Sequence, residues 1–257
     1  MAAVRTGLGL LKANVLRHVA PRPIRTDLRV PTCSVTFDDA HRSAVHNGVP
    51  VLLAHRAEAT FYVAAGLRPD DGYLDRSDIA TLTAHGFDIG CHTFSHYRLD
   101  HGTSTGLERD ATRNRRAFSS ELGLPPARDF AYPFGEVSPS GKRRIGQAYA
   151  TARSVYPGVN RRGGDLLLLR ANPLFSASMS WDAVRNLLAT AIERNGWVIF
   201  YTHGVALDPD PRSCVPEDLD RLLTECRRLG LVVRSVRSVS EELLPDWSRG
   251  PAGPPPP

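Results

Sequence analysis

The chain has 257 residues, of which 42% are hydrophobic and 23% charged, so it is neither disordered throughout nor a collagen-like or coiled-coil rod. It contains no run of 18 apolar residues, which argues against a transmembrane segment. The net charge is only +5 and the arginine doublets are scattered along the chain, so we expect no nucleic-acid partner.

The four cysteines lie far apart without a CxxC pair, so the sequence predicts neither a disulfide framework nor a structural zinc site. The first residues carry no convincing signal sequence, and on that ground we expect a cytoplasmic location. We predict an N-terminal arm over residues 1–27, one domain over 28–246 and a disordered proline-rich tail over 247–257. No pattern in the sequence indicates an oligomeric state.

Short apolar runs alternate with helical patterns along most of the chain. Such runs are typical of parallel strands that are covered on both faces. The predicted strands are 34–37, 60–63, 87–91, 130–132, 150–154, 166–170, 197–202 and 231–236.

Helical patterns with recognisable ends lie between these strands. Ser138-Pro139 is a typical helix start, and four apolar stripes each end at a glycine. The stripes lie within 79–85, 107–122, 181–195 and 219–229. Repeated β–α alternation predicts an α/β fold, a single-domain (β/α) barrel of about seven parallel strands. An open doubly wound sheet is the alternative.

Three polar clusters follow predicted strands, where a barrel of this kind places its active site. They are Asp38-Asp39, the segment from His92 to His96, and His203. Two histidines and one carboxylate form a ligand set that leaves positions on a metal open for water and substrate. Such a metal lowers the pKa of bound water from about 15.7 to about 7. A second carboxylate can then accept the water proton, and a histidine can protonate a leaving amine.

Each cluster also has an ordinary structural explanation. Adjacent aspartates often form a turn or a helix cap. Two histidines four residues apart recur by chance, and His203 would also fit a buried histidine with satisfied hydrogen bonds. The position of all three clusters at strand ends favours a common site for metal-assisted amide hydrolysis.

Four segments together resemble the successive motifs of the polysaccharide deacetylases of carbohydrate esterase family 4. They are TFDD at 36–39, HTFSH at 92–96, AYPFG at 131–135 and FYTH at 200–203. The resemblance extends over roughly residues 30–240. It implies a distorted (β/α) barrel and metal-dependent deacetylation of sugars.

Position by position, the resemblance also implies roles for individual residues. Asp38 resembles the general base and His203 the general acid, while Asp39, His92 and His96 resemble the metal ligands. We expect one divalent metal ion, zinc before iron, cobalt or manganese, which suit the same ligands.

The turn that begins at Pro133 has a further implied role, since the amide of Phe134 would help to hold the oxyanion. At the start of this motif, many members have an arginine that pairs with the base, but this chain has Ala131. Arg128 lies three residues early, and we expect Arg170 to act as the substitute.

The sequence leaves open which carboxylate orients His203, with Asp165 and Asp182 as the candidates. It predicts a metal-dependent hydrolase that removes an acetyl group from an N-acetylated sugar or glycan. One alternative is an amide or ester hydrolase of the same superfamily with a non-sugar substrate. The other is a catalytically inactive glycan-binding protein on the same barrel.

Overall fold

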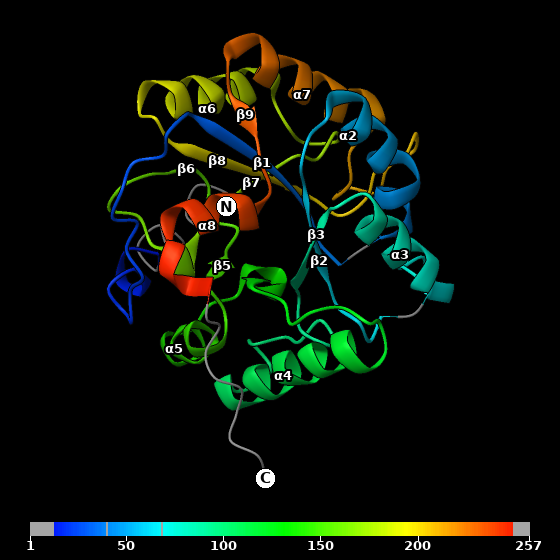
Figure 1. Cartoon of the computed structure of the whole chain (residues 1–257), viewed down its shortest axis with the longest axis vertical. Helices are drawn as coiled ribbons and strands as arrows, with labels where there is room; N and C mark the ends of the chain where they lie inside the picture. The colour runs from blue at the N-terminus through cyan, green and yellow to red at the C-terminus, as the bar shows by residue number, and fades with distance from the viewer. Residues whose placement is uncertain (1–12, 40, 68, 249–257) are drawn as a thin grey trace.

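A computed structural model describes residues 13–39, 41–67 and 69–248, which form a curled sheet surrounded by helices (Figure 1). The strands are β1 (Thr32–Phe37), β2 (Thr60–Val63), β3 (Asp88–Cys91), β4 (Asp129–Ala131), β5 (Thr151–Arg153), β6 (Val159–Asn160), β7 (Asn172–Pro173), β8 (Trp197–Thr202) and β9 (Val232–Val233). Their order is β5-β4-β3-β2-β1-β8-β6, with β7 paired to β8 and β9 paired to β1. Only β6 runs antiparallel to its neighbour among these strands. The predicted distorted (β/α) barrel is confirmed.

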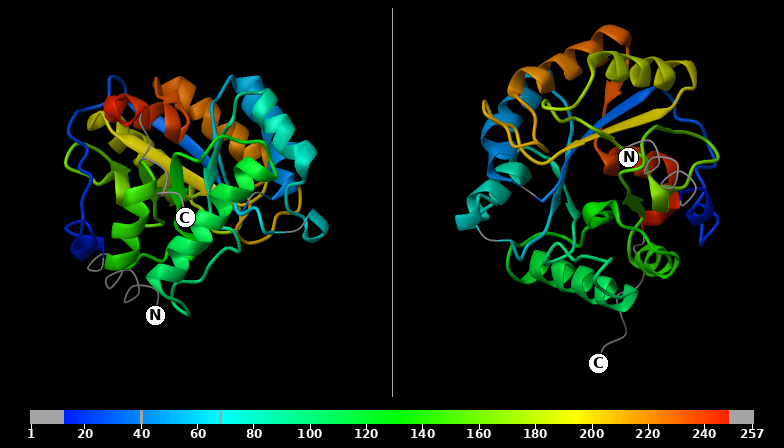
Figure 2. Two further views of the ribbon diagram at one scale, coloured as in Figure 1. Left: turned by 60° about the horizontal axis from the view of Figure 1, so that its bottom comes forward. Right: turned by 180° about the vertical axis from the view of Figure 1, so that it is seen from behind.

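Helices cover the outside of the curled sheet, as two further views show (Figure 2). They are α2 (Val49–His55), α3 (Arg76–Ala84), α4 (Ser104–Ser120), α5 (Pro139–Ala148), α6 (Trp181–Glu193), α7 (Pro216–Leu229) and α8 (Val236–Leu243). The hydroxyl of Ser138 accepts a hydrogen bond from the Gly141 amide and caps α5, as its sequence predicts. Among the described residues, no helix is long and apolar enough to cross a membrane.

Two apolar cores follow from the alternation of side chains along the strands. On β1, Cys33, Val35 and Phe37 belong to the large core between the sheet and the helices. The alternate residues point into the barrel, where Ser34 accepts a hydrogen bond from the indole of Trp197. Trp197 belongs to a smaller core that also includes side chains of α8. Asp38 follows directly after β1 and, by the same alternation, also faces into the barrel.

The predicted strand over 166–170 is wrong. Residues Leu166–Leu168 form a 3₁₀ turn instead, because the carboxylate of Asp165 accepts a hydrogen bond from the Leu167 amide at 3.0 Å and starts that turn. Only Leu169 makes a bridge to β5, at Arg153. An apolar run of this length fits a buried turn as well as a strand.

The described part of the predicted arm packs against the barrel. Leu16 is 1% exposed and Ile24 is 4% exposed. The buried ammonium of Lys142 donates hydrogen bonds to the carbonyls of Leu16 at 2.9 Å and Val19 at 2.6 Å, and it pairs with Asp165. Residues 1–12 and 249–257, which include most of the predicted tail, lie outside the described residues.

Candidate functional site

The polar clusters follow strands that are close neighbours in the sheet. Phe37 of β1 pairs with Thr202 of β8, so Asp38 and His203 leave the sheet from adjacent positions. On the other side of β1, β2 separates it from β3, after which His92 follows. Parallel strands therefore bring residues far apart in sequence to one end of the barrel.

Asp39, His92 and His96 form the candidate metal centre. The Nε2 atoms of His96 and His92 lie 3.0 and 3.3 Å from Oδ1 of Asp39. One ligand atom from each residue lies within 4.8 Å of the other two. Oδ1 of Asp39 is buried and receives no hydrogen bond from the described residues. A buried carboxylate oxygen that faces two imidazoles fits a cation between the three side chains.

The hydrogen bond of His92 fixes which ring nitrogen is available to a metal. Its Nδ1 lies 2.9 Å from the carbonyl oxygen of Ala131. Because a carbonyl can only accept, Nδ1 carries a hydrogen, and in the neutral imidazole Nε2 therefore presents its lone pair towards Asp39. This arrangement is typical of a metal-bound histidine.

The charge of Asp39 is set by two opposing effects. Burial alone raises the pKa of this carboxyl group, but its close contacts with the imidazoles of His92 and His96 outweigh that effect. As a result, the pKa of Asp39 is well below its usual range. The carboxylate is therefore ionised, as a metal ligand must be.

Several residues of the site adopt left-handed backbone conformations. The φ angles are 63° at Asp39, 62° at Thr93, 53° at His96 and 57° at Phe134. Non-glycine residues in this region cost about 1–3 kcal/mol each and are held there only by surrounding contacts.

Those contacts are visible in the loop that carries His96. Asp110 of α4 accepts hydrogen bonds from the amides of Phe94 and Ser95 at 2.8 and 2.9 Å. The hydroxyl of Thr93 accepts another from the Tyr97 amide. The sequence did not single out Asp110, whose role depends on how α4 packs against β3.

Asp38 pairs with Arg153 inside the barrel. Nη2 of Arg153 lies 2.5 Å from both carboxylate oxygens of Asp38, and both side chains are buried. Arg153 is the register partner of Ala131 across β4 and β5. The arginine that the motif lacks at Ala131 is therefore supplied by the neighbouring strand.

The expectation that Arg170 pairs with Asp38 is wrong. Nη1 of Arg170 donates a hydrogen bond to the Pro157 carbonyl at 2.7 Å, and its side chain lines a different cavity. The error follows from the predicted strand over 166–170, whose end would have faced the site. Arg153 lay within the predicted strand over 150–154, but the register between β4 and β5 that places it beside Ala131 is not visible in the sequence.

His203 is oriented by the backbone rather than by a carboxylate. Its Nδ1 lies 3.1 Å from the carbonyl oxygen of Arg212, and its Nε2 lies 3.7 Å from Oδ2 of Asp39. Both carboxylates considered from the sequence lie elsewhere, since Asp165 pairs with Lys142 and Asp182 with Arg185. Neither therefore orients His203.

A cavity of about 200 Å³ opens beside these groups. Its wall includes Asp38, His92, His96 and His203 together with aromatic side chains, among them Tyr132, Phe134, Phe175 and Tyr201. Phe134 follows Pro133 in a tight turn, is 40% exposed, and has its ring centre 4.3 Å from that of His96. The cavity combines groups for proton transfer with an aromatic surface against which a sugar ring can pack.

Comparison with known proteins points to one family. The family model described as polysaccharide deacetylase matches residues 25–150. A search of curated proteins finds no match.

Solved structures share the fold. One is a putative polysaccharide deacetylase from Mycobacterium smegmatis, with 17% identity, a TM-score of 0.62, and coverage of 93% of this chain and 100% of that one. A family 4 acetyl xylan esterase from Clostridium thermocellum in complex with a cobalt ion has 19% identity and a TM-score of 0.56, over 83% and 90% of the two chains. A family 4 pseudoenzyme from Bacillus anthracis has 14% identity and a TM-score of 0.54, over 83% and 66%.

Proposed function

The chain belongs to the polysaccharide deacetylase family of hydrolases, and we propose that it removes the acetyl group of an N-acetylated sugar or glycan with one divalent metal ion. The observation that supports this most directly is the cluster of Asp39, His92 and His96 beside Asp38 and His203. The cluster offers three ligands, and its neighbours offer a base and an acid.

The ligand set of the cluster suits zinc, with iron, cobalt or manganese as alternatives. When bound, such an ion would supply Lewis acidity for the acetamide carbonyl and a water of lowered pKa. Two observations support this assignment: among the described residues Oδ1 of Asp39 has no hydrogen-bond partner, and Nε2 of His92 has a lone pair available.

Asp38 is the proposed general base for the attacking water. Its contact with Arg153 fixes the carboxylate within the cavity wall, so that it does not need to reorganise as the proton arrives. Arg153 is a positioning residue in this scheme, because it acts through Asp38.

His203 is the proposed general acid for the leaving amine. With its Nδ1 hydrogen directed at the Arg212 carbonyl, its Nε2 faces the cavity, and the doubly protonated ring can deliver its Nε2 proton to the nitrogen as the amide bond breaks. The amide of Phe134, in the turn begun by Pro133, is proposed to stabilise the oxyanion, a contact worth about 2.7–4 kcal/mol.

The first test measures metal content and acetate release together. Purified protein is analysed for metals and then incubated with a panel of N-acetylated sugars and glycans, and with non-sugar acetamides. We expect acetate release that a chelator abolishes and added zinc or cobalt restores. Metal-loaded protein that releases no acetate across the panel would contradict the proposal and favour a glycan-binding protein, whereas release only from non-sugar amides would favour the second alternative.

Variants separate the proposed roles. Asp38→Asn should keep the metal and lose turnover by roughly 10²–10⁴-fold, the usual range for a general base. His96→Ala should lose the metal itself, whereas the control His85→Ala, at an exposed histidine outside the site, should keep both metal and activity. Full activity of Asp38→Asn would exclude it as the base.

A further inference from the structure

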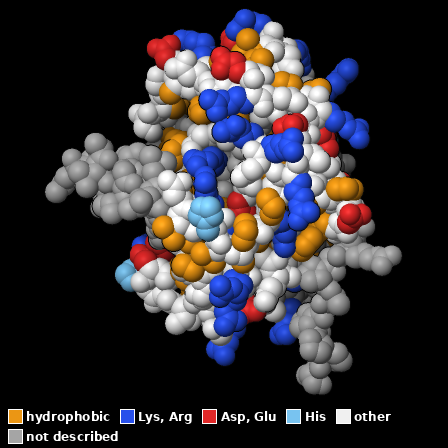
Figure 3. Space-filling view, turned by 90° about the vertical axis from the view of Figure 1, so that its left-hand side faces the viewer, with side chains coloured by type: hydrophobic (Ala, Val, Ile, Leu, Met, Phe, Trp, Pro, Cys, Tyr) orange, Lys and Arg blue, Asp and Glu red, His pale blue; other side chains and the backbone are white. Residues whose placement is uncertain are grey.

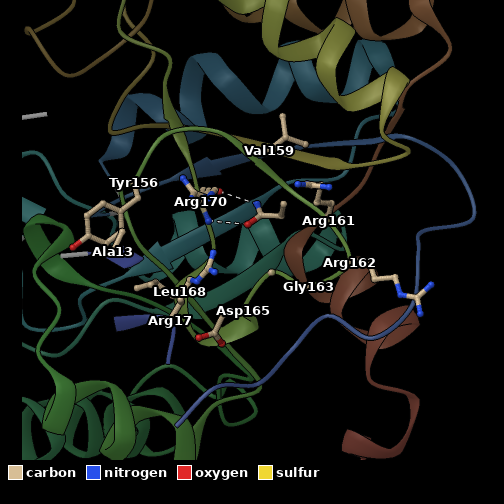
Figure 4. A pocket seen from close by; sticks show the side chains of 12 residues that line it. Ala13, Arg17, Tyr156, Val159, Arg161, Arg162, Gly163, Asp165, Leu168 and Arg170 are labelled. Atoms are coloured by element: carbon tan, nitrogen blue, oxygen red, sulfur yellow. Dashed lines mark hydrogen bonds between the residues drawn. The ribbon is translucent and has the colours of Figure 1, made fainter. Parts of the chain in front are cut away.

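A second cavity, of about 170 Å³, lies between β6, the following turn and the N-terminal segment (Figure 4). It shares no lining residue with the candidate site. Four arginines line it, namely Arg17, Arg161, Arg162 and Arg170. On the side of the molecule where this segment lies, basic side chains surround a hollow (Figure 3).

The positive charge of this cavity is poorly compensated within the described residues. Among the residues that the structure describes, Arg162 alone of the four arginines has an acidic partner, Asp27, at 3.9 Å. The one acidic residue in the wall, Asp165, is buried and already paired with Lys142. Several guanidinium groups around one hollow repel each other, so an anion between them would relieve an unfavourable interaction.

Part of the cavity is held in place before any ligand arrives. Asn160 accepts a hydrogen bond from the Arg170 amide and donates one to the Arg170 carbonyl, each at 2.9 Å (Figure 4). Nη1 of Arg170 is fixed on the Pro157 carbonyl. In Figure 4, Arg17, Arg161 and Arg170 lie around the same space, while Arg162 lies further out. A preorganised arginine loses little freedom on binding.

We propose that this cavity binds a phosphate or diphosphate group. Arginine forks match the oxygens of phosphate, and hydrogen bonds between ionised groups are stronger than neutral ones. A hollow lined by one sign of charge also raises the local concentration of the opposite ion. The small volume limits the occupant to a compact group, carried either by a soluble phosphate ester or by a lipid headgroup.

The test is calorimetric titration of the intact chain with inorganic pyrophosphate at low ionic strength. We expect saturable binding to wild type that weakens as sodium chloride screens the charges. Arg17→Glu/Arg161→Glu should bind at least about tenfold more weakly, since two charge-assisted contacts become repulsive. The control Arg109→Glu/Arg116→Glu carries the same charge change on exposed positions of α4 and should stay within about twofold of wild type.

Two further experiments separate a loss of binding from a loss of folding, and show whether the phosphate belongs to a soluble ester or to a lipid. Arg161→Gln alone should weaken binding at an unchanged unfolding midpoint, because the side chain is exposed. Sedimentation with phosphatidic acid vesicles, but not with neutral vesicles, would assign a lipid headgroup, and no sedimentation would assign a soluble ester. Absence of pyrophosphate binding, or equal losses in the cavity variant and the α4 control, would overturn the proposal.

Discussion

At the scale of single residues, the contact between Asp38 and Arg153 affects both the stability of the fold and the position of the proposed general base. The Arg153 side chain is fully buried, and its charge is balanced by one carboxylate. Removal of one partner from a buried pair leaves an uncompensated charge and costs about 3–5 kcal/mol. The same contact holds the proposed base in position for the reaction.

We expect Arg153→Met to lower the free energy of unfolding by about 3–5 kcal/mol and to reduce kcat, while the metal content stays unchanged. The double variant Arg153→Met/Asp38→Asn should recover much of the stability and none of the activity. Urea unfolding, elemental analysis and acetate release measure the three quantities. Additive losses of stability in the double variant would show that the two side chains do not interact.

Moving the arginine from position 153 to position 131 tests in a second way whether a guanidinium beside Asp38 is needed for activity. Because Ala131 and Arg153 are register partners, Ala131→Arg in the Arg153→Ala background places a guanidinium on the adjacent strand. Partial return of kcat relative to Arg153→Ala alone is the expected result. No return would mean that the arginine acts only from β5.

The motifs predicted the residues that the structure brings together at the barrel end, because each follows directly on a strand. Arg153 was not recognised, since its pairing with Asp38 depends on the register between two strands of three residues each. Residues in such short strands show no periodicity from which a register can be read. The carbonyl that orients His203 carries no side-chain signal at all.

At the scale of elements, β4 and β5 also carry a buried acid. Asp129 accepts a hydrogen bond from the Thr151 hydroxyl at 2.7 Å. Burial raises the pKa of Asp129 to about 6, and the Thr151 hydrogen bond only partly opposes this. Below pH 6 the folded protein therefore binds a proton that the unfolded chain releases near pH 4.

The contribution of Asp129 to stability should accordingly fall as the pH rises from about 4 to about 6, and stay low above that window. Asp129→Asn keeps an acceptor for Thr151 and removes the charge. We expect the variant to gain up to about 3 kcal/mol relative to wild type between pH 4 and pH 7.5, from the difference between the two pKa values. Urea unfolding at both pH values measures this gain, and a pH-independent difference would contradict it.

Long strands and helices were predictable where the sequence carries both an apolar pattern and a defined end. The predicted ranges for β2 and β8 agree with the structure, and α7 ends at the left-handed Gly230. The two-residue strands β6 and β7 were missed, because strand pairing rather than local pattern defines them. The predicted strand over 231–236 extends too far, because Val236 is the first residue of α8.

At the scale of the whole molecule, Lys142 ties the N-terminal segment to the barrel. Its ammonium group is fully buried and contacts two backbone carbonyls as well as Asp165. Asp165 in turn accepts a hydrogen bond from the Arg22 amide. One buried cation therefore joins α5, the turn after β6 and the beginning of the described chain.

Lys142→Met should lower the free energy of unfolding by about 3–5 kcal/mol, because Asp165 is left buried without its partner. Arg143→Met, at the next and exposed position of α5, is the control and should change stability by less than about 0.5 kcal/mol. Denaturant unfolding measures both, and hydrogen exchange over residues 13–22 should quicken only in the Lys142 variant. Equal effects of the two substitutions would show that the ion pair contributes little.

The carbonyl that holds His203 belongs to a surface loop, in which Asp210 accepts hydrogen bonds from the Arg212 amide and the Ser213 hydroxyl. Asp39 and His92, by contrast, lie within two residues of a strand end, and His96 lies in the loop that Asp110 of α4 holds in place. The proposed proton donor and the proposed metal ligands are therefore held by separate parts of the fold. We therefore expect substitutions in the loop around Arg212 to change how the leaving group is protonated in the proposed reaction, while the candidate metal centre keeps its geometry.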